Sequence, residues 1–216
     1  MQDRPVAAGA MFAVAALIFT GANATGSVPQ ARGVQIGIPP TTYFIDDGAA
    51  DTGYKASDRQ LATWALQAWE RSSGGALRFE AAPEMRAHIR VYWAGPNSGQ
   101  YGEMRPLIVD GQRGAAVYVR PDTEALGPDI ARLAAADPLV RETIVYLTCL
   151  HELGHALGLS HTSDYADIMY FFGFGGDIPG YFDRYRRQLT TRADIASVTG
   201  LSINDIVRLR AIHRVR

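Results

Sequence analysis

The chain is poor in cysteine and in net charge, and it carries no repeated or biased segment. Cys149 is the only cysteine among 216 residues, so an intramolecular disulfide is excluded. A formal net charge of −1 provides no strong field, and we expect no nucleic-acid partner. With 47% apolar residues, the length suits one domain with a full core and requires no second domain.

The apolar run near the N-terminus is short for a membrane span. Residues 6–20 form a run of about fifteen residues, which is typical of the core of a signal peptide. Residues 22–24, Ala-Asn-Ala, follow with the small-x-small pattern of a cleavage site. The residues before the run lack the net positive charge typical of a signal peptide, because Asp3 offsets Arg4. We expect cleavage after residue 24, with an uncleaved anchor as the alternative.

We expect three parts along the chain. We expect a signal peptide over residues 1–24, a linker over 25–41 and one domain over 42–216. Cleavage would leave a domain with no stable membrane span. In either case the domain would lie outside the cytoplasm, secreted or periplasmic.

Three of the five histidines lie within eleven residues, in the pattern H-E-x-x-H-x-x-G-x-x-H. His151 and His155 are four apart, so on a helix they project from one face and can bind one ion. Glu152 is placed to polarise a water on that ion, and Gly158 can end the helix in a left-handed conformation. His161 can then approach from the other side. Three neutral imidazoles leave one zinc position open, which is typical of a catalytic zinc.

The helix that carries this motif can be read independently. Asp137-Pro138 supplies an N-cap followed by proline at the first helical position. Apolar residues then recur at helical spacing: Leu139, Val140, Ile144, Val145, Leu147 and Leu150. A buried amphipathic helix alone would explain the leucines, but not the glutamate, the glycine and the third histidine at their offsets.

A methionine follows eight residues after the last histidine, in Asp167-Ile168-Met169-Tyr170. With these residues the chain resembles the metzincin zinc peptidases, and most closely the matrixins. The resemblance places Met169 and Tyr170 in the methionine-containing turn beneath the metal. Thr162 is similar to the small hydroxyl residue that follows the third histidine in matrixins.

The resemblance covers roughly residues 42–213. A capping box at residues 57–60 predicts a helix, and residues 76–80 and 88–93 predict strands. Residues 201–212 are similar to the closing helix of the family. We therefore expect an α/β (α+β) zincin-like fold, with a twisted mixed β-sheet on two main helices. A smaller C-terminal subdomain would carry His161, Met169 and the closing helix.

Several family features are missing. No propeptide with a zinc-ligating cysteine appears between residues 24 and 42, and Cys149 is expected to be a buried structural thiol. The His- and Asp-rich loop for a structural zinc is absent from residues 95–114, and no calcium site can be assigned.

The segment after the methionine also departs from the family. Phe171-Phe172-Gly173 replaces the usual Pro-x-Tyr, and residues 171–200 form a longer segment than usual. Its aromatic residues either line an apolar pocket or pack the segment onto the domain: Phe171, Phe172, Phe174, Tyr181 and Phe182. Tyr170 and Tyr181 are candidates for stabilising an oxyanion, with ordinary packing as the alternative.

Two further stretches have more than one interpretation. Residues 103–109 and 115–120 predict a hairpin across Asp110-Gly111, with Pro106 on an edge strand where a metzincin substrate would add. An ordinary surface hairpin is the alternative. Residues 181–216 hold eight arginines against three aspartates. They form either a solvated helical surface or one that attracts acidic substrates.

The resemblance implies a secreted zinc endopeptidase that acts on protein or peptide substrates. One catalytic zinc would be bound by His151, His155 and His161, with Glu152 as general base. The alternatives are an extracytoplasmic zinc-bearing binding module with little or no turnover, and an adhesion or structural domain with a vestigial site. Neither the oligomeric state nor the preferred substrate follows from these residues.

Overall fold

We describe a computed structural model of the chain over residues 39–95 and 101–213. The expected signal peptide and almost all of the expected linker lie outside the described residues. Among the residues described, no helix combines the length and the apolar character needed to cross a bilayer.

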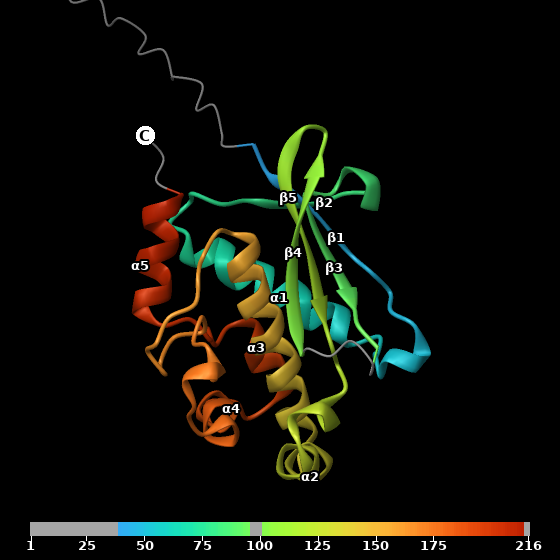
Figure 1. Cartoon of the computed structure of the whole chain (residues 1–216), viewed down its shortest axis with the longest axis vertical. Coiled ribbons are helices and arrows are strands. Elements are labelled where there is room, and N and C mark those ends of the chain that lie inside the picture. The colour runs from blue at the N-terminus through green and yellow to red at the C-terminus, as the bar shows by residue number, and fades with distance from the viewer. Residues whose placement is uncertain (1–38, 96–100, 214–216) are drawn as a thin grey trace, which may run out of the picture. The chain divides into compact units, whose positions relative to one another are not determined.

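A five-stranded mixed sheet forms one side of the core (Figure 1). Its strands are β1 (Thr41–Ile45), β2 (Phe79–Ala81), β3 (Ile89–Trp93), β4 (Gly102–Val109) and β5 (Gln112–Val119). The order is β2-β1-β3-β5-β4, in which β4 alone runs antiparallel to its neighbour. In β3 the expected alternation is observed, because Ile89, Val91 and Trp93 are buried and the residues between them are not.

The β4–β5 hairpin places β4 at the edge of the sheet. Asp110 and Gly111 form its two-residue turn with φ angles of 50° and 76°, as a type I′ turn requires. Pro106 lies in β4. An edge strand tolerates proline, because one side of the strand has no neighbouring strand to which an N–H group would donate. The hairpin and the edge position of Pro106 are both as the sequence predicts.

Two long helices, α1 (Asp58–Ser72) and α3 (Pro138–Ala156), pack against each other and share one core with the sheet. Buried Trp69 of α1 donates its indole N–H to the carbonyl oxygen of Leu150 in α3, at 2.9 Å. Asp137 caps α3 through Leu139 N at 2.9 Å, as predicted, with Pro138 at the first helical position.

Three shorter helices complete the fold: α2 (Pro128–Ala136), α4 (Ile178–Arg186) and α5 (Ile203–Ile212). In Figure 1, α3 lies between the sheet and α4. Within the described residues, five short 3-10 helices connect these elements: Ala50–Thr52, Glu84–Arg86, Thr123–Leu126, Phe172–Phe174 and Arg192–Ala196. The last two lie in the long segment after Met169, together with α4.

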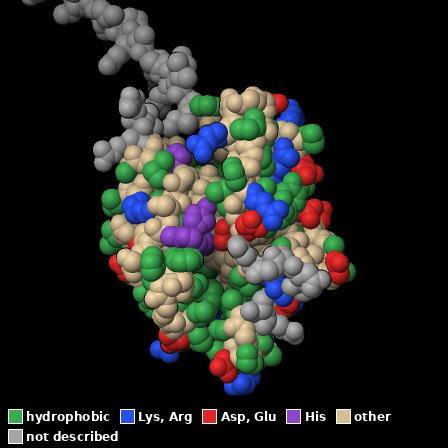
Figure 2. Space-filling view, in the orientation of Figure 1, with side chains coloured by type: hydrophobic (Ala, Val, Ile, Leu, Met, Phe, Trp, Pro, Cys, Tyr) green, Lys and Arg blue, Asp and Glu red, His purple; other side chains and the backbone are tan. Residues whose placement is uncertain are grey.

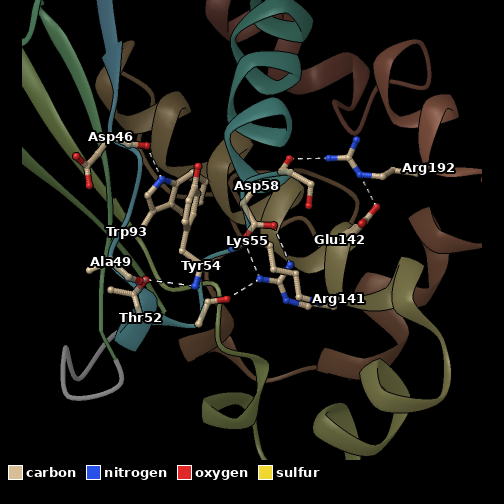
Figure 3. A network of polar contacts seen from close by, with 12 residues as sticks. Asp46, Ala49, Thr52, Tyr54, Lys55, Asp58, Trp93, Arg141, Glu142 and Arg192 are labelled. Carbon is tan, nitrogen blue, oxygen red and sulfur yellow. Dashed lines mark hydrogen bonds and ion pairs between the residues drawn. The ribbon is translucent and has the colours of Figure 1, made fainter.

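The expected capping box at the start of α1 is wrong. Ser57 adopts a helical conformation and its side chain makes no capping hydrogen bond. Instead Asp58 is fully buried and accepts from Lys55 N at 2.9 Å. Its two carboxylate oxygens also accept from Arg141 of α3, at 2.8 Å each (Figure 3). A charged partner on another helix therefore takes the place of the local cap.

A second ion pair extends this network. Arg192 contacts Glu142 of α3 at 2.9 Å (Figure 3). It also donates to the carbonyl oxygen of Ser57 at 2.6 Å. Arg186 likewise contacts Asp137 at 2.7 Å, and Arg210 donates to the carbonyl oxygen of Ser72 at 2.9 Å. Many arginines of the C-terminal stretch thus tie one element to another, beyond forming a solvated surface.

Candidate metal centre

Three histidine side chains converge at one point. His151 and His155 project from α3, and His161 approaches from the loop that follows it. The Nε2 atom of His161 lies 3.2 Å from that of His151 and 3.1 Å from that of His155. Among the described residues, these three form the one cluster of potential ligands of this kind. The sequence-predicted ligands are therefore brought together.

The end of α3 explains how His161 returns to the helix. Gly158 follows the last helical residues with a φ of 94°, a conformation that glycine adopts without strain. Leu159 N donates to the carbonyl oxygen of Gly154 at 2.9 Å, as in a Schellman motif. Beyond His161 the chain is pinned by Thr162, whose N–H donates to the carbonyl oxygen of Met169 at 2.9 Å.

Backbone carbonyl oxygens fix the tautomers of the two helical histidines. The Nδ1 atom of His151 lies 2.7 Å from the carbonyl oxygen of Ile168, and that of His155 lies 2.8 Å from that of Leu159. A carbonyl oxygen can only accept, so each Nδ1 carries the proton. The Nε2 lone pairs then point at the shared centre, which is the usual outer support of a metal-binding histidine.

Burial keeps these histidines neutral. It lowers the pKa of His151 to about 4, with a smaller contribution from the neighbouring His155 and His161. Burial also lowers the pKa of His155 and of His161. Neutral imidazole is the form that binds a metal ion.

The donor set fits zinc. Ligand nitrogens about 2.1 Å from a tetrahedral ion lie roughly 3.4 Å from one another. The two Nε2 separations at His161, 3.2 and 3.1 Å, are close to that value. Three neutral imidazoles and one open position match a catalytic zinc better than a structural one.

Glu152 lies beside the histidines and is 7% exposed. Burial raises its pKa to about 8, and the nearby Glu103 adds to the rise. Gly102 of β4 approaches it closely, because a Cβ atom at that position would lie 2.5 Å from Glu152 Oε1. The edge strand therefore passes directly over this carboxyl group.

Met169 is completely buried against α3. A Cβ atom at Gly154 would lie 2.4 Å from the Met169 sulfur, so glycine is needed for this contact. The sequence predicted the importance of Met169 but not that of Gly154. Its position inside a predicted helix was the one indication, because a glycine there often allows another group to pack closely against the helix.

A cleft of about 540 Å³ opens onto the three histidines and Glu152. One part of its wall is Tyr101 and residues 102–104 of β4, and another part belongs to the segment after Met169. Its apolar lining includes Tyr101, Met104, Leu126, Leu147, Phe171, Phe172, Tyr181 and Phe182. Figure 2 shows histidine side chains gathered on this face with hydrophobic side chains beside them.

The aromatic segment serves both of the functions that the sequence left open. Tyr181 and Phe182 are buried in the core and also line the cleft. The hydroxyl groups of Tyr170 and Tyr181 donate to the carbonyl oxygens of Gly175 and Asp167, at 2.8 and 3.0 Å. These bonds favour packing over an oxyanion role for either tyrosine.

Cys149 is buried, and burial raises the pKa of its thiol, as expected for a structural thiol.

The sequence placed residues 103–109 on the edge strand at the site, but it missed three other lining residues and the helix α4. Residues 101, 102 and 126 carry no motif, and only the position of β4 and η3 (Thr123–Leu126) brings them to the site. The helix α4 has a signal that went unused. Asp177 precedes Ile178-Pro179 and accepts from Gly180 N at 3.0 Å, in the same manner as Asp137 at α3.

Comparison with known proteins gives two findings. A family model described as matrixin matches residues 39–174, which include all three histidines and Glu152. Human matrix metalloproteinase-20 is 33% identical over 109 residues, which are 49% of this chain and 21% of that protein. The chain thus spans about a fifth of the length of that relative. Helices α4 and α5 lie beyond the region that the family model matches.

Proposed function

The chain belongs to the matrixin family, and from this premise we propose that it is a secreted zinc-dependent endopeptidase. One observation carries the proposal. Three histidine Nε2 atoms converge beside the buried carboxyl group of Glu152, in a cleft of about 540 Å³. Proteins and peptides are the proposed substrates.

His151, His155 and His161 would hold one zinc ion. When bound, zinc would lower the pKa of a water towards roughly 7 and polarise the scissile carbonyl group. The protein contributes the geometry in advance, since the carbonyl oxygens of Ile168 and Leu159 orient two of the three rings.

Glu152 would move the proton. Peptide hydrolysis places OH on the carbonyl carbon and a proton on the leaving nitrogen as the C–N bond breaks. As a carboxylate, Glu152 accepts a proton from the attacking water and later gives it to the amine. Its position supports this role, because the carboxyl group lines the same cleft as the three histidines that would hold the zinc.

The substrate would bind as an added strand along β4. This strand is at the end of the sheet order, and its residues 102–104 line the cleft. The backbone groups on the outer edge of β4 are thus available for pairing with an extended peptide. Gly102, next to Glu152, would hold the peptide backbone close to the carboxyl group.

The location and processing of the chain are part of the same proposal. Cleavage after residue 24 would release the domain over residues 42–216, preceded by the linker over 25–41. N-terminal sequencing of the exported protein tests it. A first residue before Thr25 would contradict the boundary.

The decisive experiment is hydrolysis of a mixed peptide library by the exported protein, with zinc content measured in parallel. We expect one zinc per chain and cleavage that a chelator abolishes and added zinc restores. Glu152→Ala should reduce turnover by about 10²–10⁴-fold and retain zinc. Glu80→Ala, at an exposed position of β2, is the matched control.

Each result has one meaning. Absence of zinc would overturn the metal site, and turnover by Glu152→Ala would overturn the role of that residue. Bound zinc without any cleavage would favour the alternative of a zinc-bearing binding module.

A further inference from the structure

We propose that Phe171 and Phe174 form an aromatic platform at the rim of the cleft, which binds a second apolar side chain of the peptide substrate. The first such side chain would enter the apolar part of the cleft between Leu147 and Phe182. The inference rests on the proposed function, which it extends to the class of substrate.

The platform is exposed although it is entirely apolar. Phe171 is 44% and Phe174 is 64% exposed. Phe171 stacks on His161 with ring centroids 4.8 Å apart and an interplanar angle of 26°. Phe174 contacts Phe171 edge-on, with centroids 5.4 Å apart and an angle of 90°. Two touching aromatic rings in solvent next to a metal centre are typical of a binding surface.

The core does not explain these two side chains. Phe172, which lies between them in sequence, turns inward and contacts Tyr181 with ring centroids 4.9 Å apart. It thereby anchors the segment on α4. Phe171 and Phe174, in contrast, keep much of their surface in water. Covering that surface with an apolar group is favourable.

The backbone holds the platform in place before any substrate binds. Phe171 N donates to the carbonyl oxygen of Thr162 at 3.2 Å, next to His161. Phe174 N donates to the carbonyl oxygen of Phe171 at 3.0 Å, which closes the turn. A Cβ atom at Gly173 would lie 2.1 Å from the ring of Phe171, so glycine lets the ring lie flat over the turn. A preformed surface gains affinity because little order is lost on binding.

The occupant is the substrate, because the platform continues the cleft. Phe171 lines the same cleft as Glu152, the histidines and residues 102–104 of β4. In an extended peptide along β4, alternate side chains point to the same side. The residue two positions from the one in the apolar pocket therefore points to the same wall. We expect a preference for a large apolar or aromatic residue there.

The test compares peptides that share the pocket residue and carry either Phe or Ser two positions away, on each side in turn. The wild-type protein should cleave the Phe peptide with a kcat/KM about 10-fold higher on one side. Phe174→Ala should bring this ratio close to 1, with the Ser peptide and the zinc content unaffected. Phe174→Leu should keep part of the preference. Phe174 is chosen because, unlike Phe171, it does not touch His161.

Val207→Ala is the matched control, since Val207 is 59% exposed on α5 and does not line the cleft. A ratio that survives Phe174→Ala, or that is absent in the wild type, overturns the platform. Absence of all cleavage would overturn the proposed function instead. In that case, Kd values of the same peptides for Glu152→Gln, with and without Phe174→Ala, still decide the platform by the same ratio.

Discussion

At the scale of residues, the metal centre depends on atoms that the histidines themselves do not contain. Ile168 and Leu159 contribute only carbonyl oxygens, yet these fix which nitrogen of His151 and His155 is free to bind. Within the described residues, no carbonyl oxygen accepts from the His161 ring, so the position of this ring depends on its neighbours in the loop. We therefore expect zinc binding to depend on the residues that hold this loop in place.

Arg208 of α5 provides such support. Its Nη2 atom donates to the carbonyl oxygen of Ser160 at 2.8 Å and to the Ser160 hydroxyl at 3.1 Å. We predict that Arg208→Ala weakens zinc binding about 10-fold, because the residue before His161 loses its anchor. Competition with a chelator of known affinity measures the change, and Arg208→Lys should restore part of it.

Arg210→Ala is the control for this effect. Arg210 lies on the same helix but donates to the carbonyl oxygen of Ser72, away from the histidines. If both variants lost zinc equally, the effect would come from α5 as a whole and the assignment to Arg208 would be wrong.

At the scale of elements, the buried pair between α1 and α3 holds together the two helices that support the sheet. Asp58 is 0% exposed and its side chain is bound on both oxygens by Arg141. Its replacement leaves the Arg141 guanidinium, itself 11% exposed, without its partner. Removing one member of a buried pair costs more than the pair contributes, because the other charge stays buried.

We predict that Asp58→Ala lowers the free energy of unfolding by about 3–5 kcal/mol. Asp129→Ala, which removes the Asp129–Arg132 pair on α2, should change it by less than about 1 kcal/mol, since both side chains there are 76% exposed. Urea unfolding of both variants measures the two changes. Similar values for the two would show that burial does not set the strength of these pairs.

At the scale of the whole molecule, the buried carboxyl group links stability to pH. The pKa of Glu152 is about 8 in the folded, metal-free protein against an ordinary value of 4.5. Between these values the folded state binds more protons than the unfolded state. The contribution of Glu152 to the free energy of unfolding is thus fully present below about pH 4.5 and is lost as the pH rises through about 8.

We predict that the metal-free wild type loses stability relative to Glu152→Gln over this interval, by at most about 1.4 kcal/mol per pH unit. Comparing the two proteins cancels the opposite effect of His151, whose lowered pKa of about 4 makes stability fall on acidification below the ordinary value of 6.5. Urea titrations at several pH values provide the measurement. With zinc bound, the difference should shrink, because a nearby cation lowers the pKa of a carboxyl group. A constant difference in the metal-free protein would contradict the prediction.

The family, the mixed fold and the convergence of the three histidines could all be predicted from short patterns in the sequence. The spacing of His151, His155, Gly158 and His161 is local, and helix geometry converts it directly into positions in space. The long helix α3 and the β4–β5 hairpin were predictable for the same reason, since an N-cap, a proline and a two-residue turn act over a few residues.

Contacts between residues far apart in the chain could not be predicted in this way, because they arise from the packing of whole elements. The buried partner of Asp58 lies 83 positions along the chain, so a local capping box was the wrong prediction there. The packing of elements also decides three contacts at the site. These are the close approaches of Gly102 to Glu152 and of Gly154 to Met169, and the hydrogen bond from Arg208 to Ser160. Packing also turned Phe172 inward and left Phe171 and Phe174 at the rim of the cleft. Such contacts follow from shape and burial across the whole fold, and no short pattern in the sequence encodes them.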